Sequence, residues 1–150
     1  MRIEPLTDAE RVRFIAAARA MVCAPFRHRG RSARGVDCVG LVALAMAAVG
    51  RTVADRKSYG RNPVKDGLLG VCESHLGPPV QDMQAGDVVA MSWRSDADGP
   101  LTNHVGIVFD YPLGGFAIVH ALASAGRVVE HRLSDEWAGR IDAIYRTGAP

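Results

Sequence analysis

Three side chains in this sequence are of the types that carry nucleophilic chemistry, and Cys38 is the first of them. It lies in the segment DCVGLV, residues 37–42, where a glycine-containing loop gives way to an apolar stretch. Asp37 is a favourable N-cap residue, so Cys38 is predicted to fall in the first turn of a helix. Unsatisfied backbone N–H groups and the helix dipole favour an anion there. We therefore expect a lowered thiol pKa and a reactive thiolate at Cys38.

Two histidines could supply the base that a cysteine nucleophile needs. His104 begins one predicted strand and His120 lies near the end of the next, with the turn between them over 110–115. Residues whose numbers sum to about 224 then face each other, so the two histidines are predicted to lie opposite or one diagonal step apart, on the same face. One imidazole could take the proton of Cys38 while the other fixes its tautomer. Acyl transfer requires such a nucleophile, base and orienting group.

Each of these residues alone has a simpler interpretation. A single buried cysteine usually acts as a small hydrophobic residue, and a single histidine on a strand is usually structural. The joint occurrence of a cysteine at a helix start and two paired histidines favours a functional role. Cys23 and Cys72 lack a comparable context and are predicted to be structural, so we expect alkylation of Cys38 ahead of both.

The elements that must position these residues follow from periodicity and capping signals. A capping box at 7–10 begins a first helix, which Pro25 ends, and the helix that carries Cys38 is apolar on nearly every face and should be buried. The predicted helices cover 8–22, 37–49 and 64–76, the predicted loops 26–35, 51–62 and 94–102, and the predicted strands 86–93, 104–110, 116–121, 127–133 and 141–146. Helices followed by consecutive short strands indicate an α+β fold in which the buried nucleophile helix packs on a roughly five-stranded antiparallel sheet. We expect residues 1–150 to form a single domain.

Composition and charge exclude several classes of protein. The chain has 150 residues, of which 48% are hydrophobic and 23% charged, as is ordinary for a soluble globular protein. A formal charge of +2 is too small to argue for nucleic-acid binding. Three cysteines without a CxxC pair argue against a disulfide framework or a zinc ribbon, so we expect no metal and no cofactor.

The N-terminal residues and the arginine content bear on location and ligands. No apolar segment typical of a signal peptide follows Met1, and the longest apolar run, 38–49, is too short to span a bilayer. We therefore expect synthesis in the cytoplasm without a signal peptide, and no membrane insertion. Four arginines precede Asp37 and fit a solvated loop as well as an anionic substrate: Arg27, Arg29, Arg31 and Arg34.

Four sequence blocks, in order, resemble those of the NlpC-type cell-wall cysteine peptidases. Residues 37–42 (DCVGLV) are similar to the family's DCSG(L/F)V block, and 25–28 (PFRH) resemble its PY entry segment. Residues 86–89 (GDVV) followed by 104–107 (HVGI) resemble its GDLV and HVGI blocks, and 119–121 (VHA) match the place of its third polar residue. Together these blocks span most of the chain.

The resemblance implies a papain-like α+β fold and hydrolysis of a peptide bond in the peptidoglycan stem, typically between D-γ-glutamyl and a diamino acid. It implies that Cys38 is the nucleophile, His104 the general base and His120 the orienting residue, with the Cys38 backbone N–H donating to the oxyanion. The substrate-binding residues that we assign are Phe26, Arg27, His28, Asp37, Val39, Trp93 and Asn103. Two of them depart from the family pattern: Val39 replaces the usual serine and Phe26 the usual tyrosine, and both positions bear on peptide preference.

The long form of the entry segment, 25–32, looks most like the single-domain versions encoded with phage and gene-transfer-agent tails. This implies phage-like tail proteins as partners and action at the cell wall or periplasm through a phage-like particle. Two alternatives stay open. One is an amidase or acyltransferase of the same fold that acts on another substrate, and the other is a non-catalytic tail-tip assembly protein.

Overall fold

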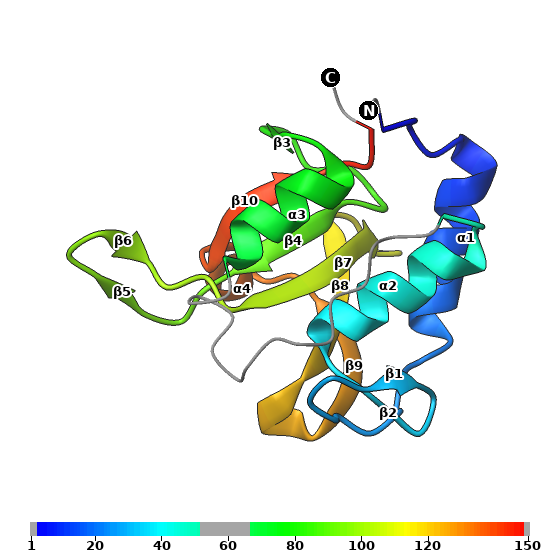
Figure 1. The fold of residues 1–150 in the computed structure, drawn as a ribbon, viewed down its shortest axis with the longest axis horizontal. Helices are drawn as coiled ribbons and strands as arrows, with labels where there is room; N and C mark the ends of the chain where they lie inside the picture. Colours follow the sequence, from blue (N-terminus) through cyan, green and yellow to red (C-terminus); the bar gives the residue numbers. More distant parts are fainter. Residues whose placement is uncertain (1–2, 52–66, 149–150) are drawn as a thin grey trace.

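The computed structural model of the protein describes residues 3–51 and 67–148, in which helices precede most of the strands (Figure 1). In chain order the elements are α1 (Asp8–Arg19), β1 (Arg31–Ser32), β2 (Gly35–Val36), α2 (Cys38–Ala48), α3 (Leu68–Leu76), β3 (Pro79–Val80), β4 (Val88–Met91), β5 (Ser95–Asp96), β6 (Gly99–Pro100), β7 (His104–Asp110), β8 (Phe116–Leu122), the 3-10 turn η1 (Ala123–Ala125), β9 (Arg127–Arg132), α4 (Asp135–Ala138) and β10 (Ile141–Tyr145).

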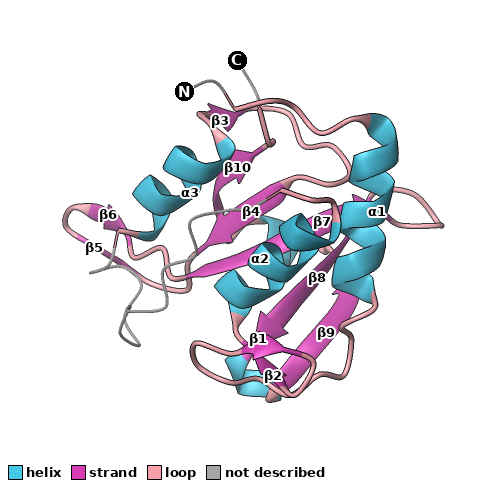
Figure 2. Ribbon diagram, turned by 45° about the vertical axis from the view of Figure 1, so that its right-hand side comes forward, coloured by secondary structure: helices cyan, strands magenta, loops and turns pink. Residues whose placement is uncertain are grey.

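The main sheet has six strands in the order β3-β10-β4-β7-β8-β9, and every neighbouring pair is antiparallel. The strand beyond the expected five is β3, a two-residue strand at one edge. Figure 2 shows α1, α2 and α3 together over one face of this sheet. The five longer strands lie where periodicity predicted them, with ends displaced by at most a few residues.

The two faces of the sheet pack against different partners. Val105, Ile107 and Phe109 alternate along β7 into the larger core cluster, which also contains Leu41 of α2 and Phe14 of α1. Val108 of the same strand belongs to a second cluster on the opposite face, where Trp137 of α4 packs against Ile118 and its neighbours. Strand β7, which begins with His104, is therefore buried on both faces.

Helix α2 begins as predicted, with Asp37 as its N-cap: the Asp37 side chain accepts a hydrogen bond from the backbone N–H of Gly40. The helix is buried along one side, but Ala47 and Ala48 near its end are exposed, so it is not covered all round. The first turn packs directly against the preceding segment. A Cβ atom at Gly40 would lie 2.3 Å from the Gly30 carbonyl oxygen, so this contact requires glycine.

The segments predicted as loops contain two small hairpins. At the end of the predicted loop 26–35 the chain pairs β1 with β2, which extends one residue beyond that range, and within 94–102 it pairs β5 with β6. Each of these strands has only two residues, too few to show a period-two pattern in the sequence.

The end of the first helix differs from the prediction, and the start of the third can be compared only within the described residues. Helix α1 ends at Arg19, earlier than residue 22, because the chain then joins the sheet edge: Cys23 adopts a positive φ of 77° and donates its N–H to the Val128 carbonyl. Helix α3 begins at Leu68 after Gly67, which has a left-handed backbone (φ 71°). The predicted start of this helix at 64 and nearly all of the predicted loop 51–62 lie outside the described residues.

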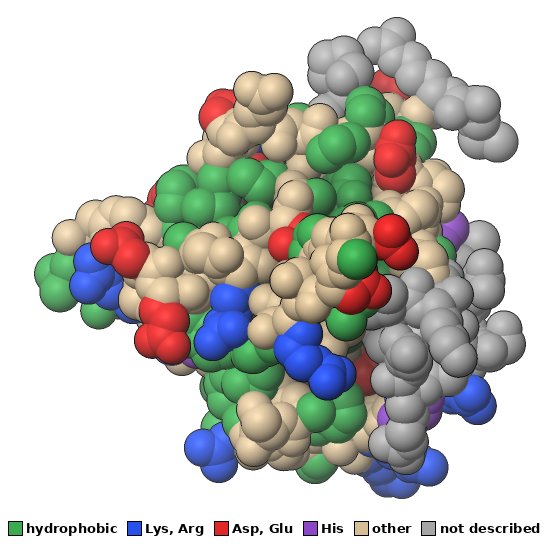
Figure 3. All heavy atoms as spheres, turned by 90° about the vertical axis from the view of Figure 1, so that its left-hand side faces the viewer, with side chains coloured by type: hydrophobic (Ala, Val, Ile, Leu, Met, Phe, Trp, Pro, Cys, Tyr) green, Lys and Arg blue, Asp and Glu red, His purple; other side chains and the backbone are tan. Residues whose placement is uncertain are grey.

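Within the ranges 3–51 and 67–148, no helix is long and apolar enough to cross a membrane. Acidic, basic and hydrophobic side chains are interspersed on the face of the molecule that Figure 3 shows. This mixture agrees with the small formal charge of +2.

Candidate active site

Cys38 is the first residue of α2, and a network centred on Asp37 holds this helix end. One Asp37 carboxylate oxygen accepts from the Gly40 N–H (2.8 Å) and from Nη1 of Arg31 (2.9 Å), and the other accepts from the Arg29 N–H (2.8 Å). The Asp37–Arg31 ion pair is largely buried, with side-chain exposures of 5% and 11%. The first turn of α2 is thus joined to the chain before it by charge-assisted hydrogen bonds.

The Cys38 thiol is buried, with 9% of the residue exposed. The backbone N–H of Val105, the residue after His104, donates toward its sulfur, and so do the N–H groups of Val39 and Cys38 itself. These donors favour the thiolate, but burial outweighs them and, with the nearby Asp37 carboxylate, raises the thiol pKa to about 11. The expected lowering of this pKa is wrong, because the helix-start position was weighed without the cost of desolvation.

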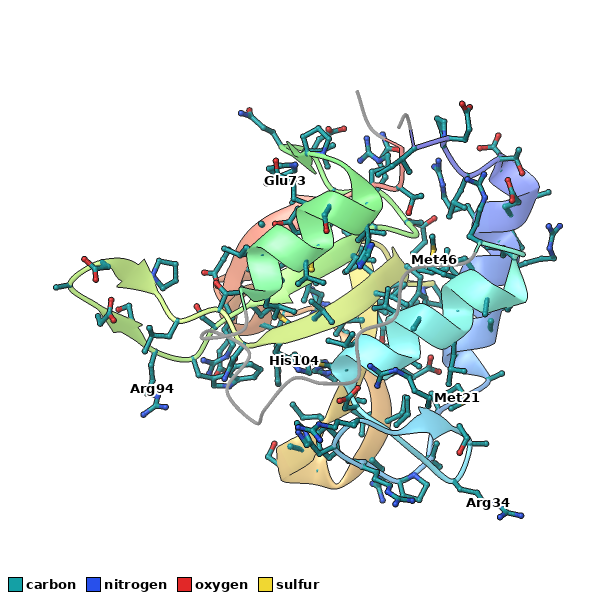
Figure 4. The ribbon with its side chains drawn as sticks, viewed as in Figure 1. Met21, Arg34, Met46, Glu73, Arg94 and His104 are labelled. Atoms are coloured by element: carbon teal, nitrogen blue, oxygen red, sulfur yellow. The ribbon has the colours of Figure 1, made fainter. Side chains whose placement is uncertain are left out.

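His104 and His120 come from adjacent strands and contact each other. The β7–β8 register pairs Ile107 with Val119, which places the two histidines one diagonal step apart. The distance from Nε2 of His104 to Nδ1 of His120 is 2.7 Å, a short hydrogen bond. The predicted pairing of the two imidazoles is therefore confirmed. Figure 4 shows His104 beside the N-terminal end of α2, where Cys38 lies.

Both of these histidines are uncharged at neutral pH. Burial lowers the pKa of His104 from its usual 6.5 to about 4. Burial, together with the neighbouring His104 and His131, lowers the pKa of His120 to about 3. With the thiol pKa raised as well, the resting site holds a neutral thiol and neutral imidazoles rather than an ion pair.

A third histidine, His131 of β9, extends the pair into a chain, and the sequence reasoning missed it. Nε2 of His120 lies 2.9 Å from Nε2 of His131, and Nδ1 of His131 lies 2.8 Å from the Arg132 carbonyl oxygen. His120 pairs with Val129 across the β8–β9 turn, so His131 is again one diagonal step away. The count across the preceding hairpin, repeated across the turn at Gly126, would have found it.

Two tryptophans cover this chain of histidines. Trp137 packs edge-on against His120 at a ring-centroid distance of 5.3 Å and lies 4.9 Å from His131. Trp93 packs edge-on against His104 at 5.4 Å and is 40% exposed. The guanidinium of Arg140 lies over both indoles, 5.3 and 5.7 Å from their centroids. Trp93 was predicted for substrate binding, whereas Trp137 and Arg140 were not singled out.

The remaining predicted binding residues lie on three stretches of the chain: 26–28, 37–39 and residue 103. Phe26 bridges to Val36 and Arg27 donates its N–H to the Val36 carbonyl, so both border the start of α2. His28 belongs to the same segment, and Val39 is the residue after Cys38, half-buried against the core. Asn103 is exposed and immediately precedes His104. Asp37 is only 3% exposed, and its carboxylate is engaged by the protein donors described above.

The other cysteines and the possible metal ligands are distributed as follows. Cys72 is buried in the core, whereas Cys23 is exposed. In the part of the chain that the structure describes, no three His, Cys, Asp or Glu side chains are arranged to hold a metal ion. The histidine chain is linear, each ring bonded to the next, and does not converge on a point.

Comparison with known proteins places this arrangement in a family. Residues 23–146 match the sequence profile of the NlpC/P60 family. No curated protein matches the chain. Among solved structures, the NlpC/p60 domain of the peptidoglycan hydrolase SagA is 20% identical with a TM-score of 0.59, and the match covers 91% of this chain and 98% of that one.

Two further solved structures are similar in fold. The P60 domain of an antigen from Mycobacterium avium subspecies paratuberculosis is 18% identical (TM-score 0.60), with 95% of this chain and 97% of that one covered. A lipoprotein-like NLP/P60 protein of Staphylococcus aureus is 17% identical (TM-score 0.66), and the match covers 99% of this chain but 44% of that one. The chain thus spans less than half the length of the staphylococcal protein. At these identities the likeness shows a shared fold, and the predicted papain-like α+β fold is confirmed.

Proposed function

The chain belongs to the NlpC/P60 family, and from that premise we propose that it is a cysteine peptidase that hydrolyses peptide bonds in peptidoglycan stem peptides through a thioester. One observation carries the proposal. The Cys38 sulfur accepts from the backbone N–H of Val105, directly after His104, and His104 is hydrogen-bonded to His120. A nucleophile, a base and an orienting group therefore adjoin at one end of the sheet.

In the proposed first step, Sγ of Cys38 attacks the substrate carbonyl carbon while the thiol proton passes to Nδ1 of His104, the nitrogen not engaged with His120. The carbonyl π bond becomes an oxyanion, which accepts from the backbone N–H at the start of α2. Collapse of the intermediate breaks the C–N bond, and the departing amine takes the proton from His104. A water molecule then attacks the thioester carbon and gives a proton to His104. The C–S bond breaks, the peptide leaves with a new carboxyl group, and the Cys38 sulfur takes the proton back from His104.

The directions in which burial moves the two pKa values favour one course for the attack within this proposal. Because burial raises the Cys38 pKa to about 11 and lowers the His104 pKa to about 4, a resting thiolate–imidazolium pair is strongly disfavoured. Proton transfer then accompanies bond formation to the substrate carbon, so the negative charge appears on the oxyanion rather than on a resting thiolate. The helix start contributes by stabilising this developing charge.

The finer assignments belong to the same proposal. We propose the bond between D-γ-glutamyl and a diamino acid as the scissile bond, with Phe26, Val39 and Trp93 among the residues that contact the peptide. Similarity to the peptidoglycan hydrolase SagA supports the substrate class. We further propose that phage-like tail proteins deliver the enzyme to the cell wall, as the extended entry segment 25–32 suggests.

A second candidate function has one observation in its favour. Cys38 is 9% exposed and its pKa is raised, as would suit a tail-tip assembly protein that retains the fold without turnover. The intact chain of histidines beside the thiol favours the enzyme, because an assembly role places no demand on imidazole pairing. Activity measurements separate the two.

The test is digestion of purified sacculi followed by mass spectrometry of the released peptides. We expect products with a new γ-glutamyl carboxylate and a free diamino-acid amine, absent with Cys38→Ala and retained with Cys23→Ser, which alters an exposed cysteine outside the site. Identical products from Cys38→Ala would rule out the thioester route. No cleavage by the folded wild-type protein, on sacculi or on a panel of amides and acyl esters, would favour the assembly protein.

A further inference from the structure

The far end of the histidine chain is fixed by a group that can only accept a hydrogen bond. Nδ1 of His131 lies 2.8 Å from the backbone carbonyl oxygen of Arg132. A carbonyl oxygen has no proton to donate, so Nδ1 of His131 must carry one. In an uncharged imidazole the other nitrogen then has only a lone pair, which makes Nε2 of His131 an acceptor.

This single constraint also determines the tautomers of the other two histidines. His120 must donate from its Nε2 to Nε2 of His131, across 2.9 Å, which leaves its own Nδ1 as an acceptor. His104 must then donate from Nε2 to that Nδ1, across 2.7 Å. The lone pair of His104 is consequently on Nδ1, where the proposed reaction needs a base.

Without the hydrogen bond to His131, the direction of the His104–His120 hydrogen bond is not fixed from the His120 side. It can form with the proton on either nitrogen, because both rings are uncharged and each can donate or accept. In the reversed arrangement Nδ1 of His104 carries a hydrogen and cannot take the thiol proton. From the geometry we propose that His131 is a positioning residue that sets the tautomers of His120 and His104 and so keeps Nδ1 of His104 available as the base.

Packing restricts the rings to this arrangement. Trp137 lies edge-on to His120 and tilted against His131, at centroid distances of 5.3 and 4.9 Å. The backbone ladder between β8 and β9, in which His120 pairs with Val129, sets the separation of the two strands. A rotation of either ring would break a hydrogen bond on both of its sides, so the network is directional as well as rigid.

That His104 acts as a base rests on the proposed function. The tautomers of the three histidines, however, can be measured in the protein without any substrate. Nitrogen-15 NMR of the imidazoles in the full chain reports which ring nitrogen carries hydrogen. We expect Nε2–H for His104 and His120 and Nδ1–H for His131 at neutral pH. In His131→Phe, which keeps a ring but removes the acceptor, a share of His104 and His120 should change to Nδ1–H.

The kinetic expectation follows from the loss of the correct tautomer. His131→Phe should lower kcat by roughly 10-fold to 100-fold with little change in KM, as when partners that orient a histidine are removed. His131→Gln, whose amide oxygen can accept from His120, should recover most of kcat and the wild-type tautomers. His75→Gln, on α3 and outside the chain of histidines, should leave both unchanged.

The outcomes separate the inference from the proposed function. Nδ1–H on His104 or His120 in the wild type would overturn the inference, and so would wild-type tautomers together with wild-type kcat in His131→Phe. If the tautomers change with His131 but the wild-type protein cleaves no substrate, the positioning role stands and the proposed peptidase activity fails. If His131→Phe does not fold, the inference can still be tested by the nitrogen-15 spectrum of the wild type and by the tautomers and kcat of His131→Gln.

Discussion

The nucleophile and the histidines reach the same end of the sheet by different means. Cys38 is positioned by its neighbours in sequence: Asp37 caps the helix, and Arg31 and the backbone of Arg29 hold the Asp37 carboxylate. The histidines come from three strands, and each is placed by backbone pairing before ring-to-ring hydrogen bonds join them. The first arrangement is local and contains an ion pair, whereas the second is long-range and is held by ring-to-ring hydrogen bonds.

This difference predicts different vulnerabilities. The start of α2 depends on a carboxylate that is almost fully buried beside a guanidinium, so removal of a charge should damage it most. The histidine chain contains no ion pair, and burial lowers the pKa of both His104 and His120, so it should respond mainly to acid. A substitution at the start of α2 should therefore leave the histidine chain nearly intact, and a substitution in the histidine chain should leave the start of α2 nearly intact.

The largest expected effect is that of Asp37→Ala. This change removes the cap of the Gly40 N–H and takes the carboxylate away from the buried Arg31 guanidinium, so we expect a loss of about 3–5 kcal/mol in the free energy of unfolding. Urea denaturation measures it. Asp37→Asn keeps an oxygen for the Gly40 N–H and should cost less. A loss below about 1 kcal/mol would mean that the network is not what holds the helix start.

Asp87 provides a matched control for that change. It is 1% exposed and accepts from Arg146 and from the Gln84 N–H, so Asp87→Ala also breaks a buried ion pair. It should reduce stability without altering the rate at which a thiol reagent reaches Cys38 in the folded protein. Asp37→Ala should change that rate, because it loosens the turn that carries Cys38.

The second prediction concerns the charge on the thiol itself. On a Cys23→Ser background, we expect the alkylation rate of Cys38 to rise about 10-fold per pH unit, or about 100-fold between pH 7 and pH 9, because its pKa lies near 11. Mass spectrometry of the labelled peptide gives the rate. A rate independent of pH below 8 would instead reveal a preformed thiolate–imidazolium pair.

The same experiment on the wild type tests the order of labelling. Burial raises the pKa of both Cys38 and Cys72, whereas Cys23 is exposed. We now expect Cys23 to react first, the reverse of the order that the helix-start argument gave. Labelling of Cys38 ahead of Cys23 at pH 7 would restore the original expectation.

The same contrast explains which parts of the site could be predicted from the sequence. Asp37 as N-cap and Cys38 in the first turn are local signals, and the contact of His104 with His120 followed from counting across one short turn. Neither the pKa of Cys38 nor the close approach of Gly40 to Gly30 has a local signal, because both depend on segments that fold against the helix. Desolvation in particular is a property of the assembled core.

His131 falls between these cases. Its contact with His120 could have been predicted by counting residues across the turn at Gly126, as across the preceding turn. The hairpin formed by β1 and β2 was predicted only as part of a loop. The fold class could be predicted because each helix and each long strand has its own periodicity in the sequence, and the order of these elements indicates an α+β fold. The two-residue strands were not, because they have no periodicity of their own.

The last prediction concerns His104 and His120. His104 and His120 have pKa values of about 4 and about 3 in the folded protein, against a usual 6.5. Below pH 6.5 the unfolded chain binds protons that the folded chain does not, so stability falls as the pH falls from 6.5 toward 4. The slope should be about 1.4 kcal/mol per pH unit for each of the two histidines.

Urea denaturation at pH 7.5, 6.5 and 5.5 measures this slope in a range above the titration of most carboxylates. His104→Gln removes one titrating ring and should roughly halve the slope, whereas Asp37→Asn should lower stability equally at all three pH values. Equal stability at pH 7.5 and 5.5 would contradict the neutral chain, because it would require the folded protein to accept the same protons as the unfolded one. His104 and His120 would then take up protons near the usual histidine pKa of 6.5 instead of staying uncharged down to about pH 4.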